Sequence, residues 1–219
     1  MHSTVKNLIN IEKNIISYLS DLKIKNQTKI IAVSKTFKAD KILPLIQHGH
    51  IDFGENKVQE AEDKWSNLRD ANPNLKLHMI GRLQTNKVKY AVKLFDYIHS
   101  VDNEKLARKI SDEENKINKK IKIFIQVNIG GESQKSGVPK IEAHKLLAYC
   151  KELNLNVIGL MCIPPAENDP TKFFVEMRKL NMEFGFNELS MGMSSDYLKA
   201  SEHSATYLRI GSSIFGERS

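Results

Sequence analysis

The chain has 219 residues, of which 41% are hydrophobic and 27% are charged, and its formal net charge is +7. These proportions are ordinary for a folded, water-soluble domain, and no apolar run reaches the roughly 18 residues that a membrane span requires. Residues 1–23 alternate apolar and charged side chains and lack the apolar centre of a signal peptide. We therefore expect a cytoplasmic protein with no membrane partner.

The positive net charge permits a nucleic-acid-binding function, but the pattern of charges does not favour one. Lysines are scattered along the chain, and the short basic cluster at 115–122 directly follows the acidic run at 112–114. The sequence contains no zinc pattern, aromatic RNA-binding motif or basic heptad region. Cys150 and Cys162 lack the spacing of metal ligands, and no disulfide is expected in a reducing compartment. We expect a solvated, lysine-rich surface, no metal and no nucleic-acid partner; a basic binding module is the alternative.

Helical and strand-like patterns alternate along the whole chain. Residues 4–24 place apolar side chains at helical spacing and predict an amphipathic helix. Each strand-like run that follows is succeeded by a helical pattern, except the last. These runs are 29–35, 50–56, 75–81, 95–102, 121–129, 156–164, 188–194 and 206–216.

Alternating strands and helices predict parallel strands joined by right-handed crossovers. We predict an α/β fold in one domain over 1–219: an N-terminal helix within 1–27, then a (β/α)8 TIM barrel over 28–219. An open doubly wound sheet is the alternative. Gly49 and Gly185 lie where helices should end, and Asn103 lies where one should begin.

Polar residues follow the predicted strands, and TIM barrels place their active sites at the C-terminal ends of the strands. The run IIAVSK ends the first strand on Lys35, and burying an ammonium group is costly unless it is paired or neutralised. A salt bridge from Lys35 to Asp52 or Glu55 would be a purely structural explanation. The alternative is that Lys35 faces a ligand at the mouth of the barrel.

The last two strand ends, LSMGMSSD (189–196) and LRIGSSIFG (208–216), combine Gly and Ser at turns. Small residues let backbone amides approach a phosphate, and TIM barrels often bind phosphate after strands 7 and 8. A lysine on strand 1 and a phosphate site on strands 7 and 8 together suggest pyridoxal 5′-phosphate (PLP), whose aldehyde forms a Schiff base with a lysine amine. Arg209 either pairs with a carboxylate or faces the ring nitrogen, which it would keep unprotonated.

Longer motifs resemble, in order and spacing, those of the pyridoxal phosphate homeostasis proteins. The motifs are AVSKTF, DFGENKVQEAEDK, LHMIGRLQTNKVK, HSVDN, VNIGGESQKSG, GLMCIPP, ELSMGMSSDYLKA and RIGSSIFGER, between residues 30 and 218. The resemblance implies the fold of the N-terminal barrel of alanine racemase, the fold type III PLP barrel. It also implies PLP held as a Schiff base, no established turnover, and a role in balancing vitamin B6 and amino-acid pools.

Carried over motif by motif, the resemblance implies a set of PLP-binding residues. Lys35 is the Schiff-base lysine, Arg209 faces the pyridine nitrogen, and the Ser and Gly residues of the last two strand ends hold the phosphate. Asn56 and His78 line the pocket, and Met161 packs near the ring face or belongs to the core. The complete set is Lys35, Asn56, His78, Met161, Ser194, Arg209, Gly211 and Ser212.

Two positions depart from the motifs of that family. Ser204 stands where a helix-ending glycine is usual, and a non-glycine residue in a left-handed cap costs roughly 1 kcal/mol. Lys57 stands where an aromatic residue is common. Neither change affects the lysine, the arginine or the phosphate-binding turns, so they leave the expectation of PLP binding unchanged.

Two PLP-dependent functions are compatible with this set of residues. Racemisation needs a second acid/base group opposite the lysine. In alanine racemase a tyrosine from a second domain supplies it, whereas this sequence ends at Ser219, directly after the last predicted strand. We therefore expect a non-catalytic, monomeric PLP carrier, with apo-forms of PLP-dependent enzymes as its candidate partners. An amino-acid racemase is the alternative.

Overall fold

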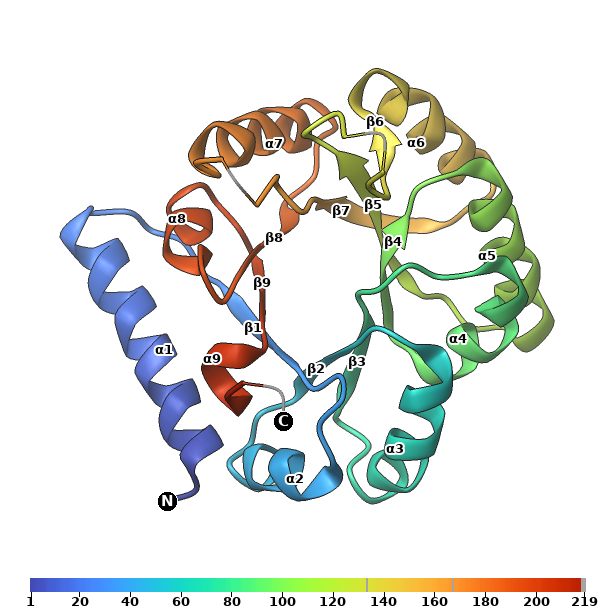
Figure 1. Cartoon of the computed structure of the whole chain (residues 1–219). Coiled ribbons are helices and arrows are strands. Elements are labelled where there is room, and N and C mark those ends of the chain that lie inside the picture. The colour runs from blue at the N-terminus through green and yellow to red at the C-terminus, as the bar shows by residue number, and fades with distance from the viewer. Residues whose placement is uncertain (133, 167, 218–219) are drawn as a thin grey trace.

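Eight parallel strands form a closed barrel in the computed structural model, which describes residues 1–132, 134–166 and 168–217 (Figure 1). Hydrogen-bonded neighbours run β4-β3-β2-β1-β9-β8-β7-β5, and pairing of β4 with β5 closes the ring. This confirms the predicted TIM barrel over the open sheet. The barrel strands are β1 (Lys29–Val33), β2 (Asp52–Glu55), β3 (Lys76–Met79), β4 (Tyr97–Val101), β5 (Lys122–Asn128), β7 (Asn156–Met161), β8 (Glu188–Met193) and β9 (Tyr207–Ile210).

A further strand, β6 (Val138–Pro139), pairs with the end of β5 outside the barrel. Two residues are too few for a strand pattern to show in the sequence. Two 3-10 turns, Thr85–Lys87 and Lys140–Glu142, lead into helices. The α-helices are α1 (Ser3–Asp21), α2 (Ala39–Gln47), α3 (Val58–Ala71), α4 (Val88–Leu94), α5 (Glu104–Ile117), α6 (Ala143–Glu152), α7 (Thr171–Glu183), α8 (Tyr197–Glu202) and α9 (Ser212–Phe215).

Helix α1 occupies a place in the ring of helices around the barrel, next to the short α9 (Figure 1). It buries one apolar stripe that includes Val5, Leu8 and Ile15. The Asn7 side chain donates a hydrogen bond to the carbonyl of Ile214 in α9, with a distance of 2.9 Å. Helix α1 therefore holds α9, and with it one wall of the barrel mouth, in place.

Helix boundaries follow the chemistry of their end residues. The Asn103 side chain accepts a hydrogen bond from the Leu106 amide at 2.9 Å and caps α5, as predicted. Gly49 follows α2 with φ +94° and Gly185 follows α7 with φ +75°, the left-handed conformation that glycine adopts without strain. Ser204 follows α8 with φ +70°. Serine therefore adopts at this helix end the conformation in which glycine is usual.

Apolar side chains form two separate cores. The larger core lies between the strands and the surrounding helices. The smaller one fills the barrel interior and consists of Ile31, Tyr97, Phe124, Met161 and Tyr207. Because these side chains block the barrel, a ligand from solvent has access only to its ends. Within the described residues, no helix has the length and apolar composition needed to cross a membrane.

Candidate functional site

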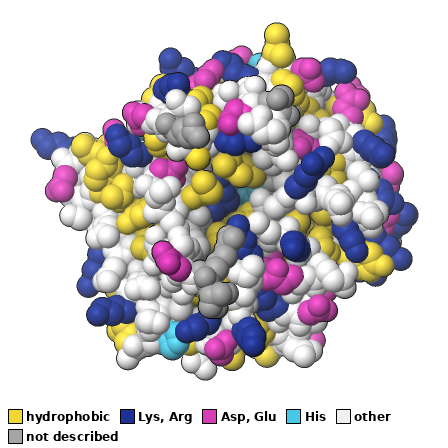
Figure 2. Space-filling model, in the orientation of Figure 1, with side chains coloured by type: hydrophobic (Ala, Val, Ile, Leu, Met, Phe, Trp, Pro, Cys, Tyr) yellow, Lys and Arg dark blue, Asp and Glu magenta, His cyan; other side chains and the backbone are white. Residues whose placement is uncertain are grey.

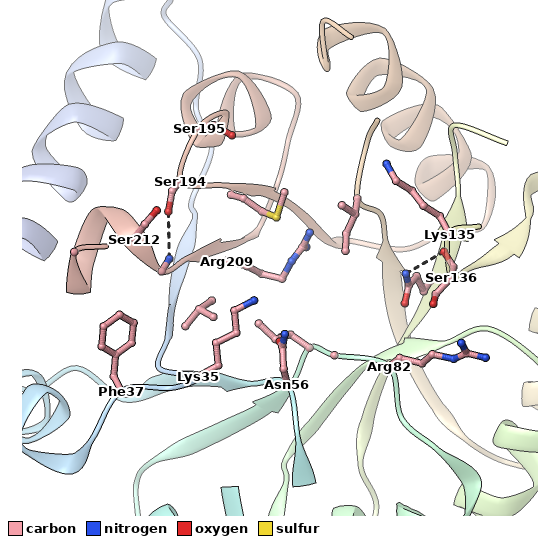
Figure 3. A pocket seen from close by; sticks show the side chains of 18 residues that line it. Lys35, Phe37, Asn56, Arg82, Lys135, Ser136, Ser194, Ser195, Arg209 and Ser212 are labelled. Atoms are coloured by element: carbon pink, nitrogen blue, oxygen red, sulfur yellow. Dashed lines mark hydrogen bonds between the residues drawn. The ribbon is translucent and has the colours of Figure 1, made fainter. Parts of the chain in front are cut away.

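A cavity of about 600 Å³ opens at the C-terminal ends of the barrel strands (Figure 3). Side chains from the loops after β1, β2, β8 and β9 converge on it, as the strand-end rule predicts. The volume lies within the usual range of small-molecule sites, about 300–1,000 Å³. Six of the eight predicted site residues line this cavity: Lys35, Asn56, Ser194, Arg209, Gly211 and Ser212.

Lys35 reaches the cavity because side chains alternate along β1 and its extension. Ile31 belongs to the interior core, Val33 lines the cavity, and Lys35 lines it two residues further on. The same alternation on β9 places Tyr207 in the interior core and Arg209 and Gly211 at the cavity. The first and last barrel strands thus present the lysine and the arginine to one space.

The backbone next to Lys35 has an unusual conformation that an ion-pair network supports. Thr36 has φ +68°, which is rare for a β-branched residue. Its amide donates a 2.5 Å hydrogen bond to Oε1 of Glu60, which also accepts from Lys64 Nζ at 3.0 Å. Partial burial of Glu60 opposes its ionisation, but the Thr36 amide and Lys64 outweigh it and lower the pKa of Glu60. The network thereby fixes the turn that follows Lys35.

Lys64 also holds the backbone that precedes Lys35. Nζ of Lys64 donates to the carbonyl of Ser34 at 2.8 Å and to Oε1 of Glu55 at 2.9 Å. The Glu55 carboxylate, which is fully buried, also accepts from the Ser34 hydroxyl at 2.7 Å and from the Trp65 indole at 2.9 Å. Glu55 is therefore paired with Lys64. This pairing counts against the structural alternative in which Glu55 forms a salt bridge with Lys35.

Two backbone amides and a serine hydroxyl form a cluster of donors at one end of the cavity. The amides of Gly211 and Ser213 both donate to Oγ of Ser194, at 3.3 and 3.4 Å. A Cβ atom on Gly211 would lie 3.4 Å from the side chain of Val33, which is an ordinary van der Waals distance. Converging backbone amides bind anionic oxygen atoms in many proteins. The cluster supplies donors of the kind that bind a phosphate, and its role as the phosphate site stays a prediction.

Arg209 is buried, with 4% of its surface exposed, and its guanidinium is held on two sides. Nη1 donates to Oγ of Ser190 and Nη2 donates to the carbonyl of Cys162, both at 2.8 Å. Both acceptors are neutral, so the structure does not support the alternative pairing of Arg209 with a carboxylate. A guanidinium has five N–H donors in one plane, and these two bonds fix that plane.

The structure places His78 and Met161 below the cavity, and neither lines it. His78 is fully buried and lies between Asp52 and His99, at 2.9 and 3.0 Å. Met161 belongs to the interior core. The expectation that His78 lines the pocket is therefore corrected, and of the two alternatives for Met161 the structure supports the core, because both side chains are fully buried in the barrel interior. The bond to His78 also gives Asp52 a partner other than Lys35.

Several side chains that the sequence did not single out also line the cavity: Phe37, Arg82, Gln126, Lys135 and Ser136. Arg82 directly follows the predicted end of the third strand, so the strand-end rule could have found it. Lys135 comes from the long segment after β5, where no pattern marks it, and it pairs with Glu132 at 2.6 Å. Arg82 and Lys135 thus add two cationic side chains to the lining of the cavity, one of them paired with a carboxylate.

Charges of both signs are interspersed over the face of the molecule shown in Figure 2. Lysine and arginine side chains on this face alternate with aspartate and glutamate and do not form one patch (Figure 2). A basic module would need a continuous positive surface to follow a phosphate backbone. The described residues of this face offer no such surface (Figure 2).

Comparison with known proteins shows the family. The model of the alanine racemase N-terminal domain matches residues 7–219. A pyridoxal phosphate homeostasis protein of Aquifex aeolicus is 40% identical over 204 residues, which cover 89% of each chain. The chain belongs to the pyridoxal phosphate homeostasis protein family. The resemblance seen in the sequence motifs is thereby confirmed.

Solved structures agree with this membership. PipY of Synechococcus elongatus, solved with PLP bound, superposes with a TM-score of 0.81 at 33% identity, covering 92% of this chain and all of PipY. An alanine racemase of Clostridium difficile superposes with a TM-score of 0.75 at 16% identity, and the match covers 57% of the racemase. At that identity the racemase shows only a shared fold. The pyridoxal phosphate homeostasis family thus uses the alanine racemase barrel.

Proposed function

We propose that this chain binds PLP as a Schiff base on Lys35, without catalytic turnover, and takes part in intracellular PLP homeostasis. The observation that carries the proposal is the meeting of three groups in one cavity: the Lys35 amine, the Ser194 donor cluster and the Arg209 guanidinium (Figure 3). Family membership supports it, since the relative PipY was solved with PLP. The proposal also includes action as a cytoplasmic monomer that supplies apo-enzymes.

Each of these groups has a separate task. PLP supplies an aldehyde and an electron-withdrawing ring. Lys35 would hold PLP covalently, because its amine would condense with the aldehyde with loss of one water. Ser194 and the amides of Gly211 and Ser213 supply donors for the phosphate. Arg209 stays charged and offers only donors, so it favours an unprotonated ring nitrogen and a weak electron sink.

The composition of the cavity supports a carrier over a racemase. Racemisation requires a second proton donor opposite the lysine. Among the described residues that line the cavity there is neither a tyrosine nor a histidine, and the second amine there, that of Lys135, is paired with Glu132 at 2.6 Å. A direct test is incubation of the PLP-loaded protein with amino acids in deuterated water. The carrier proposal predicts no α-proton exchange, and sustained exchange would support the racemase.

The primary test is chemical trapping. We expect the purified protein to take up PLP with a visible absorption band, and borohydride reduction followed by peptide mapping to place the adduct on Lys35. Lys35→Ala should abolish the band. Lys38→Ala, at an exposed lysine three residues away, is the matched control and should retain it. A protein that stays colourless and unmodified with excess PLP would contradict the proposal.

A further inference from the structure

An unbroken chain of hydrogen bonds crosses the barrel interior and ends at Arg209. Nη1 of Arg209 lies 2.8 Å from Oγ of Ser190, which lies 2.9 Å from Nδ1 of His99. Nε2 of His99 lies 3.0 Å from Nδ1 of His78, and Nε2 of His78 lies 2.9 Å from Oδ1 of Asp52. The five residues come from β9, β8, β4, β3 and β2. The chain therefore connects five of the eight barrel strands.

The two ends of this chain determine the direction of every bond in it. Arg209 can only donate, so Oγ of Ser190 accepts from it. At the other end, Asp52 needs a donor, so a neutral His78 carries its hydrogen on Nε2 and accepts at Nδ1 from Nε2 of His99. Nδ1 of a neutral His99 then accepts the hydrogen of the Ser190 hydroxyl. An ionised carboxylate can only accept, so Asp52 completes the series, and nowhere in it does a donor face a donor or an acceptor face an acceptor.

Burial keeps the rings of His78 and His99 neutral, and ring stacking fixes their orientation. Both are fully buried, and this burial lowers the pKa of His78 and lowers that of His99 strongly, so both rings are neutral near pH 7. His78 stacks on Tyr97 with ring centres 4.2 Å apart, and His99 stacks on Phe124 at 4.3 Å. Stacking fixes the ring planes, and the hydrogen bonds then fix the rings within those planes.

The far end of the chain faces a second cavity. Asp52 and Glu188 are the first residues of β2 and β8, so this cavity lies at the opposite end of the barrel from Lys35. Burial raises the pKa of Asp52, but its hydrogen bond with His78 and nearby positive charge outweigh this and leave it lowered. Asp52 is thus an ionised group placed at the end of a relay that leads to the other cavity.

We propose that Asp52 is a positioning residue for Arg209, acting through His78, His99 and Ser190 to fix the plane of the guanidinium. The inference rests on the proposed PLP site, in which Arg209 faces the ring nitrogen. Because Ser190 is held as an acceptor for Nη1, the guanidinium of Arg209 always presents the same N–H edge to the cavity. Asp52 does not contact the proposed PLP site, because the barrel interior separates it from the Lys35 cavity.

The relay can be tested without PLP. Two-bond ¹H–¹⁵N spectra of histidine-labelled protein should show neutral rings with the hydrogen on Nε2 for both His78 and His99. Asp52→Leu removes the terminal acceptor and should give mixed tautomers at His78. Asp52→Asn retains an acceptor oxygen and should preserve the Nε2 tautomers. Asp63→Asn makes the same change on the exposed face of α3 and is the control. Wild-type rings protonated on Nδ1 would overturn the relay.

The effect on Arg209 needs ring-labelled PLP. In Asp52→Leu we expect the ¹⁵N shift of the pyridine nitrogen to move and PLP affinity to fall about tenfold, the equivalent of one hydrogen bond, with borohydride still trapping Lys35. Ser190→Ala cuts the same chain next to Arg209 and should produce the same shift, even if Asp52→Leu does not fold. Unchanged shift and affinity in the folded variants would overturn the proposal. Failure of the wild type to take up PLP would instead refute the proposed function.

Discussion

Replacement of Lys64 by methionine should destabilise the fold strongly and loosen the backbone around Lys35. The Lys64 side chain is only 9% exposed, and its Nζ lies 2.9 Å from Oε1 of the fully buried Glu55. Methionine preserves most of the length of the side chain but removes the charge. The Glu55 carboxylate would then remain buried with only the Ser34 hydroxyl and the Trp65 indole as donors.

The size of this effect follows from burial. Removing one partner of a buried ion pair costs about 3–5 kcal/mol, because the other charge stays uncompensated. For a chain of this length each kcal/mol lowers Tm by about 2–4 °C, so we expect a decrease on the order of 10 °C. Removing both charges, in Glu55→Gln with Lys64→Met, should cost much less than the sum of the single changes.

Urea unfolding of the wild type, both single variants and the double variant measures this coupling directly. Lys38→Met, at an exposed lysine, is the control and should change stability by less than about 0.5 kcal/mol. The rate of borohydride trapping at Lys35 should also fall in Lys64→Met. A free energy of unfolding within about 1 kcal/mol of wild type, or additive single changes, would refute this account of the network.

Three further predictions concern stability and reactivity. Ser204→Gly should raise the free energy of unfolding by about 1 kcal/mol in urea, since φ is +70° there; a loss of stability would contradict this. Burial lowers the pKa of His78 and His99, so below pH of about 6.5 the unfolded chain binds protons that the folded chain does not. The contribution of the two histidines to the free energy of unfolding should be fully present above that pH, and below it the free energy should fall by up to about 2.7 kcal/mol per pH unit. Equal urea midpoints at about pH 7.5 and 5.5 would exclude this contribution. Burial raises the pKa of both Cys150 and Cys162 to about 12, so neither should react with iodoacetamide until the chain is unfolded; rapid labelling of the native protein, followed by mass spectrometry, would show otherwise.

The barrel and the principal site residues could be predicted because both depend on local patterns. Alternating strands and helices leave few topologies, and parallel strands place their C-terminal ends on one face. Lys35 and Ser194 follow from that rule because they lie just beyond the ends of β1 and β8, and Arg209 follows because it is the last residue but one of β9. Their direction follows from the two-residue period of the strand.

Depth along the barrel axis could not be predicted in the same way. It depends on the register between strands, such as His78 opposite both Gly54 and Tyr97, which distant parts of the chain determine together. His78 and Met161 therefore lie in the barrel interior below the cavity, and neither lines it. The support of Lys35 by Lys64 was also missed. It requires knowing how α3 packs against the end of β1, and no motif encodes that.

The Lys35 cavity spans the junction of the first and last barrel strands, where Ile31 pairs with Arg209 and Ala32 with Ile210. A growing chain emerging from the ribosome holds Lys35 almost from the start, yet it cannot complete the cavity before β9 has been made. A ligand that contacts both strands links them, so its binding energy opposes the separation of the first strand from the last. The time at which a refolding chain first captures such a ligand would therefore mark the moment at which the barrel closes.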